Sequence, residues 1–137
     1  MQRPASEAEA IEWLVDQVPE LRTLLDDHVA YYEELLPYVA FEDDFLRWFV
    51  SCVRSGEDEP AKRFVEAIEP LMTTNIEPPA NDRVWNLAGV CFVEGLVMQG
   101  DDDVLERARP WMGPNTWEDV QHQFWYRDGR LPPPRRS

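Results

Sequence analysis

The apolar residues of this chain recur every three or four positions, in blocks that proline and glycine separate. The first block contains Ile11, Leu14, Val15 and Val18, which is the spacing of one face of an α-helix. No alternating run of β-branched and polar residues with hairpin turn signals occurs in the sequence. The pattern therefore predicts an all-α fold.

Helix start and stop signals divide the pattern into seven helices. A capping box formed by Ser6 and Glu9 begins the first helix, Pro37 ends the second, and Pro114 begins the last. The predicted helices cover about residues 6–18, 20–36, 43–54, 57–72, 82–100, 101–109 and 114–126. The fifth is the most apolar, so we expect it to be central. A single-domain irregular bundle of six or seven helices follows, with stacked helical hairpins as the alternative.

Residues 1–126 are predicted to form the helical domain. Residues 127–137 hold four arginines, one acid and the sequence Leu131-Pro132-Pro133-Pro134. This composition is typical of an extended or mobile tail.

The charge of the chain restricts its partners. The net charge is −14, and residues 1–126 alone carry 26 acidic against nine basic groups. Such a surface repels phosphates, which disfavours direct nucleic-acid binding, and it attracts basic proteins. The alternative is that the acids only maintain solubility.

The location predicted from the sequence is the cytoplasm. The N-terminus lacks the apolar core of a signal peptide, and the apolar stretch from Val84 to Met98 is too short to cross a membrane. Cys52 and Cys91 lie in apolar runs and are predicted to be buried, reduced thiols.

No recognisable catalytic, cofactor or metal motif is present. His28 and His122 are far apart in the sequence, and Asp101-Asp102-Asp103 lacks the alternating spacing of a calcium loop. We interpret these three acids as capping groups at a helix start. Neither cysteine has a histidine close by in the sequence, and glycine-rich phosphate loops are missing. We therefore predict a protein that is not an enzyme and needs no cofactor or metal.

Three polar residues interrupt apolar helices. Arg47 and Glu94 are each the single charge in an apolar run, and Asn86 lies eight residues before Glu94. A buried charge requires a partner, so we expect Arg47 and Glu94 to pair, with Asn86 nearby. The pair would either fix the helix register or form a polar binding spot.

Several aromatic residues are predicted on the outside of their helices. Trp13 lies opposite Ile11 and Val15, and Tyr31-Tyr32 and Trp125-Tyr126 each place one ring outward. Exposed aromatic rings beside acids are common anchors for basic protein partners. Trp13, Tyr31, Trp125 and Tyr126 are therefore candidate interface residues, unless the last helix and tail cover them.

Three motifs carry a resemblance to a known family. They are Leu35-Leu36-Pro37-Tyr38, Phe45-Leu46-Arg47-Trp48, and the run from Asn86 to Glu94 (NLAGVCFVE); Gly113-Pro114 before the last helix adds to them. The chain resembles a family of small, acidic, all-helical, uncharacterised bacterial proteins, over roughly residues 10–120. Such proteins look like immunity proteins, which neutralise bacterial toxins. The resemblance implies a protein-binding role and assigns no catalytic or binding residue.

The functional expectation is a non-enzymatic protein-binding module. An immunity-type inhibitor of a basic effector or toxin fits the acidic charge best. The alternatives are a self-associating structural or regulatory subunit and an acidic mimic of DNA.

Overall fold

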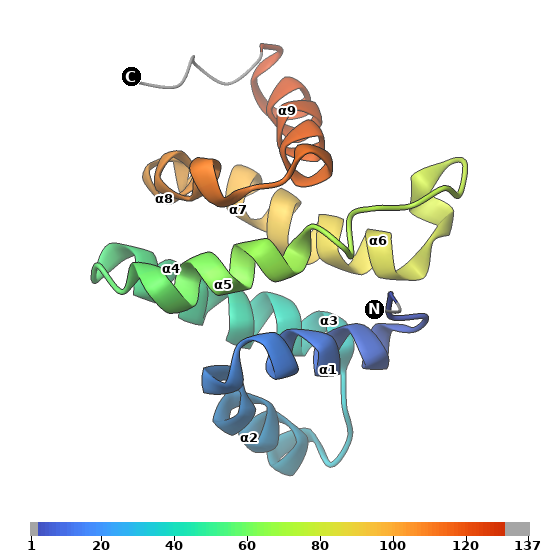
Figure 1. The fold of residues 1–137 in the computed structure, drawn as a ribbon, viewed down its shortest axis with the longest axis vertical. Helices are drawn as coiled ribbons and strands as arrows, with labels where there is room; N and C mark the ends of the chain where they lie inside the picture. The colour runs from blue at the N-terminus through green and yellow to red at the C-terminus, as the bar shows by residue number, and fades with distance from the viewer. Residues whose placement is uncertain (1–2, 131–137) are drawn as a thin grey trace.

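The computed structural model describes residues 3–130, which form seven continuous helices and contain no strand (Figure 1). The all-α, single-domain prediction is therefore confirmed. Two of the seven helices have a π-helical middle, so that α3, η2 and α4 form one helix and α6, η4 and α7 form another. The elements are α1 (Glu7–Gln17), η1 (Pro19–Leu21), α2 (Arg22–Tyr32), α3 (Pro37–Val39), η2 (Ala40–Phe45), α4 (Leu46–Arg54), α5 (Asp58–Ile68), η3 (Pro79–Asn81), α6 (Arg83–Ala88), η4 (Gly89–Glu94), α7 (Gly95–Met98), α8 (Asp102–Ala108), η5 (Arg109–Trp111) and α9 (Pro114–Asp128).

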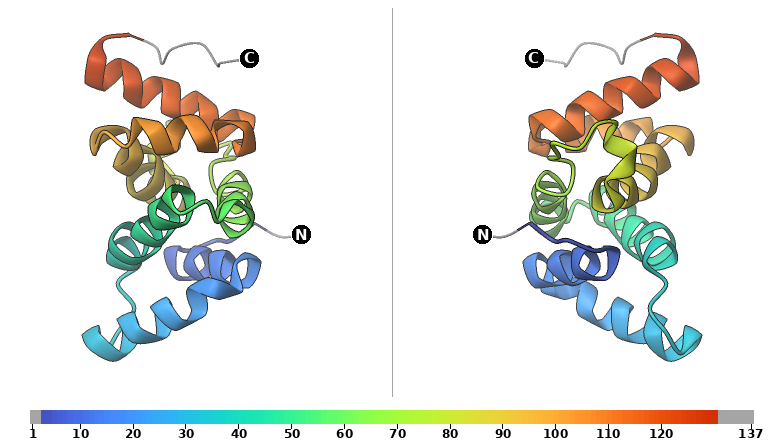
Figure 2. Two further views of the ribbon diagram at one scale, coloured as in Figure 1. Left: turned by 90° about the vertical axis from the view of Figure 1, so that its left-hand side faces the viewer. Right: turned by 90° about the vertical axis from the view of Figure 1, so that its right-hand side faces the viewer.

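The helices follow one another along the long axis of the molecule, roughly in chain order (Figure 1; Figure 2). α2 lies at one end, beyond α1, and packs against η2. The α3–α4 helix and α5 cross the middle, and α1 packs on α5. α9 lies at the other end, on η4 and α7. Since α2 and α9 are the outermost helices, each has one side free for solvent or a partner.

Phenylalanine rings from three helices fill the centre of the core. The centroid of Phe49 lies 5.5 Å from that of Phe64 and 5.3 Å from that of Phe92, and all three side chains are fully buried. The fifth predicted helix, now α6–η4–α7, is central as expected. Its buried apolar residues are Val84, Leu87, Ala88, Cys91, Phe92, Val93, Leu96 and Val97.

The boundary between the second and third helices differs from the prediction. α2 ends at Tyr32, because Glu33 takes a left-handed conformation with φ of 62°. Leu36 is extended, as the residue before a proline prefers, and Pro37 then occupies the first position of the next helix. Pro37 therefore begins a helix that was predicted to start only at Asp43.

The last helix extends beyond the predicted domain boundary. α9 continues through Arg127 and Asp128, and Gly129 follows it with φ of 68°, the left-handed conformation common after a helix. Arg127 belongs to the folded domain, since its guanidinium donates to the Val97 carbonyl at 2.8 Å and pairs with Asp102. The rest of the predicted tail, residues 131–137, lies outside the described residues.

Candidate functional site

The outer side of α2 and the turn after it combine exposed aromatic and acidic side chains. Tyr31 is 80% exposed, and Val29 and Tyr32 are each 40% exposed. The exposed residues of this surface, named the α2 face below, are Asp26, Asp27, Val29, Tyr31, Tyr32, Glu33 and Glu34. An aromatic ring that is this accessible and has acids around it suits contact with a basic protein.

The segment of the chain that contains the α2 face is strongly acidic. Residues 4–46 contain twelve acidic residues and one basic residue, Arg22. Arg22 pairs with Glu12 at 3.0 Å, and the hydrogen bond that it donates to Glu12, together with the nearby charges of Asp26 and Asp16, raises its pKa. None of the four acids of the α2 face forms an ion pair with a described residue. Their charge is therefore available to a partner.

His28 holds this region to the rest of the molecule. It is buried, and its Nε2 accepts a hydrogen bond from the Leu36 backbone N–H at 3.1 Å. Its Nδ1 lies 3.3 Å from Asp44 Oδ2 in η2, without the geometry of a hydrogen bond. One buried histidine thus ties α2 to the residue that precedes the third helix and lies close to an acid of that helix. Sequence reasoning considered His28 as a possible metal ligand and missed this role.

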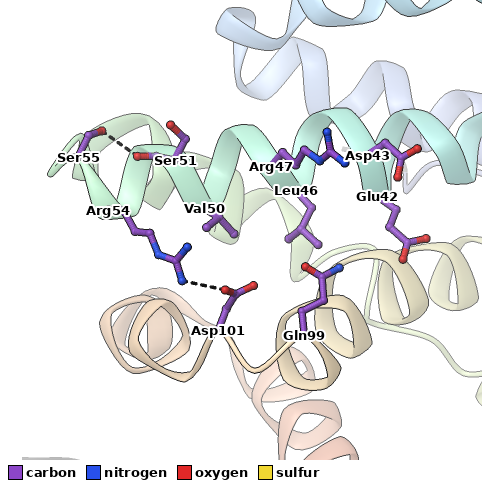
Figure 3. A pocket seen from close by; sticks show the side chains of 10 residues that line it. All are labelled: Glu42, Asp43, Leu46, Arg47, Val50, Ser51, Arg54, Ser55, Gln99 and Asp101. Carbon is purple, nitrogen blue, oxygen red and sulfur yellow. Dashed lines mark hydrogen bonds and ion pairs between the residues drawn. The ribbon is translucent and has the colours of Figure 1, made fainter.

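Arg47 lies in a groove and not in the core. The residue is exposed, and it shares an outward stripe of its helix with Ser51 and Arg54, at positions i, i+4 and i+7 (Figure 3). The groove has a volume of about 630 Å³, and its walls are this stripe on one side and Gln99 and Asp101 on the other. The predicted buried pair is not formed: no ion pair between Arg47 and Glu94 occurs in the described structure.

An arginine bridges the groove at one end. Arg54 Nη2 lies 2.8 Å from Asp101 Oδ1 and 3.4 Å from Asp103 Oδ1, so it connects α4 to the start of α8. Asp102 pairs with Arg127 of α9. The acids at this helix start were predicted to cap backbone N–H groups, but Asp101, at the N-cap, makes no side-chain capping bond. Their ion pairs with Arg54 and Arg127 hold three helices together instead.

The other two residues of the predicted polar cluster, Asn86 and Glu94, are half-buried, and each interacts with residues other than Arg47. Asn86 donates through Nδ2 to the Tyr38 hydroxyl at 2.9 Å, which joins α6 to α3. Glu94 lies close enough to Asp119 of α9 for its charge to contribute to a raised pKa there. The three residues therefore do not form one site.

The candidate interface aromatics are distributed over three helices. Trp13 is half-buried, and its Nε1 donates to the Ala67 carbonyl at 2.9 Å, so its exposure was predicted wrongly. Trp125 and Tyr126 are 59% and 77% exposed on α9, at the opposite end of the molecule from Tyr31 (Figure 1). The chain thus exposes aromatic rings at two separate ends.

A second hollow contains a buried acid that sequence reasoning missed. Asp119 of α9 is 8% exposed, and its Oδ2 has no hydrogen-bond partner. Burial raises its pKa to about 6, and the nearby Glu94 and Glu118 contribute to the shift while His122 opposes it. The available signal was that Asp119 lies between Thr116 and Val120 on the inward stripe of the last helix.

Cys52 and Cys91 are both buried, and burial raises the pKa of their thiols to about 11 and about 12. In the part of the chain that the structure describes, no three His, Cys, Asp or Glu side chains converge as a metal site. No helix among residues 3–130 is long and apolar enough to span a bilayer.

Comparison with known proteins places the chain in an uncharacterised family. The model of a family described as a domain of unknown function, DUF7674, matches residues 11–126. This span begins in α1 and ends in α9, so it includes the α2 face, the groove and Asp119. No curated protein and no solved structure matches the chain. The chain therefore belongs to the DUF7674 family of domains of unknown function.

Proposed function

We propose that this chain is a non-enzymatic protein-binding module of the immunity type, which binds and blocks a basic bacterial effector or toxin in the cytoplasm through the α2 face. One observation carries the proposal: Tyr31 is 80% exposed among four acids that pair with no described cation. The resemblance to immunity proteins in size, charge and helical make-up points in the same direction.

The two components of the α2 face would have different roles in binding. The acids Asp26, Asp27, Glu33 and Glu34 would accelerate association with a basic surface by long-range attraction. Tyr31 would supply the contact that holds the complex, since tyrosine buries a large rigid surface at small entropic cost. A nuclease toxin needs a basic surface to bind phosphates, so an acidic face can cover it.

The test compares matched variants at the two ends of the molecule. Wild type, Tyr31→Ala and Trp125→Ala are immobilised and exposed to lysate of the native host at low salt, and proteins that elute as salt rises are identified. We expect a basic protein that the wild type and Trp125→Ala retain and that Tyr31→Ala loses. Titration of the purified pair should then show affinity about 10–100-fold lower for Tyr31→Ala, the usual cost of truncating a central aromatic anchor.

Salt dependence provides the second criterion. Neutralising the four acids of the α2 face should slow association at low salt and flatten its salt dependence, with little change in dissociation. An unrelated basic protein such as lysozyme serves as a control for unspecific attraction. Equal loss of binding in Trp125→Ala and Tyr31→Ala would contradict the proposal, as would binding that does not change with salt.

The exposed rings on α9 favour one alternative, self-association through the last helix. Trp125 and Tyr126 lie side by side in sequence at the free end of the molecule. In that case, the molar mass measured by light scattering would rise with protein concentration, and Trp125→Ala would restore the monomer. If a captured partner is instead a DNA-binding protein that DNA displaces, the acidic face acts as a mimic of DNA.

A further inference from the structure

The hollow beside Asp119 has the dimensions of a small-molecule site. Its volume is about 370 Å³, near the lower end of the range for ligand pockets. It lies between α9, α6 and the segment before η3. We call this hollow the Asp119 pocket. The residues that line it are Met72, Thr74, Glu77, Pro79, Trp85, Asn115, Glu118, Asp119 and His122.

A glycine, Gly89 of η4, lies beside three residues that line this pocket. A Cβ atom at Gly89 would lie 3.4 Å from Asp119 Oδ2 and 3.8 Å from both Met72 Cε and a Trp85 ring carbon. Three lining residues therefore converge on the bare backbone of η4. The buried carboxylate oxygen faces this same point, together with an aromatic ring and a thioether methyl group.

The carboxylate of Asp119 forms no ion pair in the described structure, although the exposed His122 lies close enough for its charge to oppose the rise in the pKa of Asp119. No side chain or backbone group among residues 3–130 forms a hydrogen bond or ion pair with it. Glu77 and Glu118 also line the pocket, whereas no described lysine or arginine does. A buried, ionised carboxylate without a partner is costly, and a bound cation removes that cost.

The lining favours an organic cation over a metal ion. Within the described residues, no three potential ligands converge closely enough to hold a metal. Trp85 and Met72 instead provide an aromatic and a soft apolar surface, which suit the alkyl chain of an organic cation. We propose that the Asp119 pocket binds a small alkylammonium compound, with the ammonium group on Asp119 and the alkyl chain against Trp85 and Met72. This site is independent of the proposed function, since the α2 face contributes no residue to it.

Protonation sets the pH range of binding. Burial raises the pKa of Asp119 to about 6, with Glu94 and Glu118 adding to the shift and the exposed His122 opposing it. The carboxylate is ionised above that value, so affinity for an ammonium group should rise as pH increases through about 6 and then level off. The ammonium group itself stays protonated until well above neutral pH.

The experiment titrates the full chain with n-butylammonium and follows the backbone and Trp85 indole signals by ¹H–¹⁵N NMR. We expect saturable shifts at Trp85, Asp119 and His122, with 1-butanol and butyrate at least 10-fold weaker. Asp119→Asn keeps the shape of the side chain and should weaken binding about 10-fold or more. Glu106→Gln removes one exposed charge of α8 outside the pocket and should leave binding unchanged.

A second variant tests the shape of the site independently of its charge. Gly89 has ordinary helical dihedral angles, and its added methyl group would sit in normal van der Waals contact, so Gly89→Ala should fold. We expect it to lower butylammonium affinity about 10-fold, because the methyl group would lie against Asp119 Oδ2, where the ammonium group is proposed to bind. Equal binding of butanol and butylammonium, or undiminished binding by Asp119→Asn, would overturn the proposal. Neither result would bear on the partner experiment at the α2 face.

Discussion

The two end helices, α2 and α9, are attached to the molecule in different ways. α2 buries only Leu25 and His28 along its 11 residues, and the hydrogen bond from the Leu36 N–H to His28 adds to this packing. α9 buries Thr116, Asp119, Val120 and Phe124. α9 is also fixed at both ends by charged groups, at its start by Glu69 and near its end by Arg127.

The difference extends to the surface charge. At the α9 end, Arg127 pairs with Asp102 and Asp128, so acids and bases largely neutralise each other. At the α2 end, the four acids of the α2 face form no ion pair with a described residue. Both ends expose aromatic rings, and within residues 3–130 the α2 face combines them with four unpaired acids, whereas α9 has two, Glu118 and Asp119. Exposure alone would not distinguish the two ends, whereas ion pairing does.

The largest effect is expected at the start of α9. Glu69 Oε1 accepts from the Thr116 backbone N–H at 2.9 Å and its hydroxyl at 2.8 Å, and Oε2 accepts from the Asn115 N–H at 3.1 Å. Because Gly113 at the N-cap has no side chain to do this, Glu69 caps the helix from a distant part of the chain. We predict that Glu69→Ala lowers the free energy of unfolding by about 3 kcal/mol, measured by urea denaturation.

Glu66 provides the matched control for that prediction. It lies on the same helix with its side chain exposed, so Glu66→Ala should change the free energy of unfolding by no more than about 0.5 kcal/mol. If Glu69→Ala lowers the free energy of unfolding by less than about 1 kcal/mol, packing alone attaches α9 to the molecule. The two end helices would then differ only in how much surface they bury.

The next effect concerns Asp119 and depends on pH. Its pKa is about 6 in the folded protein against an ordinary value of 3.8, so the folded state binds a proton that the unfolded state has released between these values. Stability therefore falls as pH rises from about 4 to about 6. The shift of two units represents roughly 3 kcal/mol. Asp119→Asn should raise the free energy of unfolding at pH 7.5 by about 2 kcal/mol and not by the full amount, since the buried amide still lacks hydrogen-bond partners.

Thermal and urea denaturation at two pH values would test this. The stabilising effect of Asp119→Asn should be present at pH 7.5 and largely absent at pH 3.5, where the carboxyl group is protonated in both states. Destabilisation at pH 7.5 would show that the carboxylate has a partner within the protein, which would also remove the reason for a bound cation. A site that lowers stability in the absence of its ligand is typical of a functional site.

The fold could be predicted from the sequence because helical periodicity and proline positions are local signals. The blocks that begin with Ile11 and with Val84 both became helices with the expected buried faces. The site could not be predicted, since Arg47 and Glu94 were paired by assuming that a charge in an apolar run is buried. Arg47 in fact shares an exposed stripe with Ser51 and Arg54. Glu69 and Thr116, which form a hydrogen bond, are 47 positions apart in the sequence. Such contacts depend on tertiary geometry that no local pattern contains.

The smallest effect on stability is expected at Tyr31, and it separates folding from function. Tyr31 is 80% exposed, so Tyr31→Ala should change the free energy of unfolding by less than about 0.5 kcal/mol. Its neighbour Tyr32 has its ring centroid 4.8 Å from that of buried His28, and Tyr32→Ala should cost about 1 kcal/mol. A cost above about 1 kcal/mol at Tyr31 would show that this ring supports the attachment of α2. A negligible cost, together with lost partner binding, would mean that the ring contributes to the complex and not to the fold.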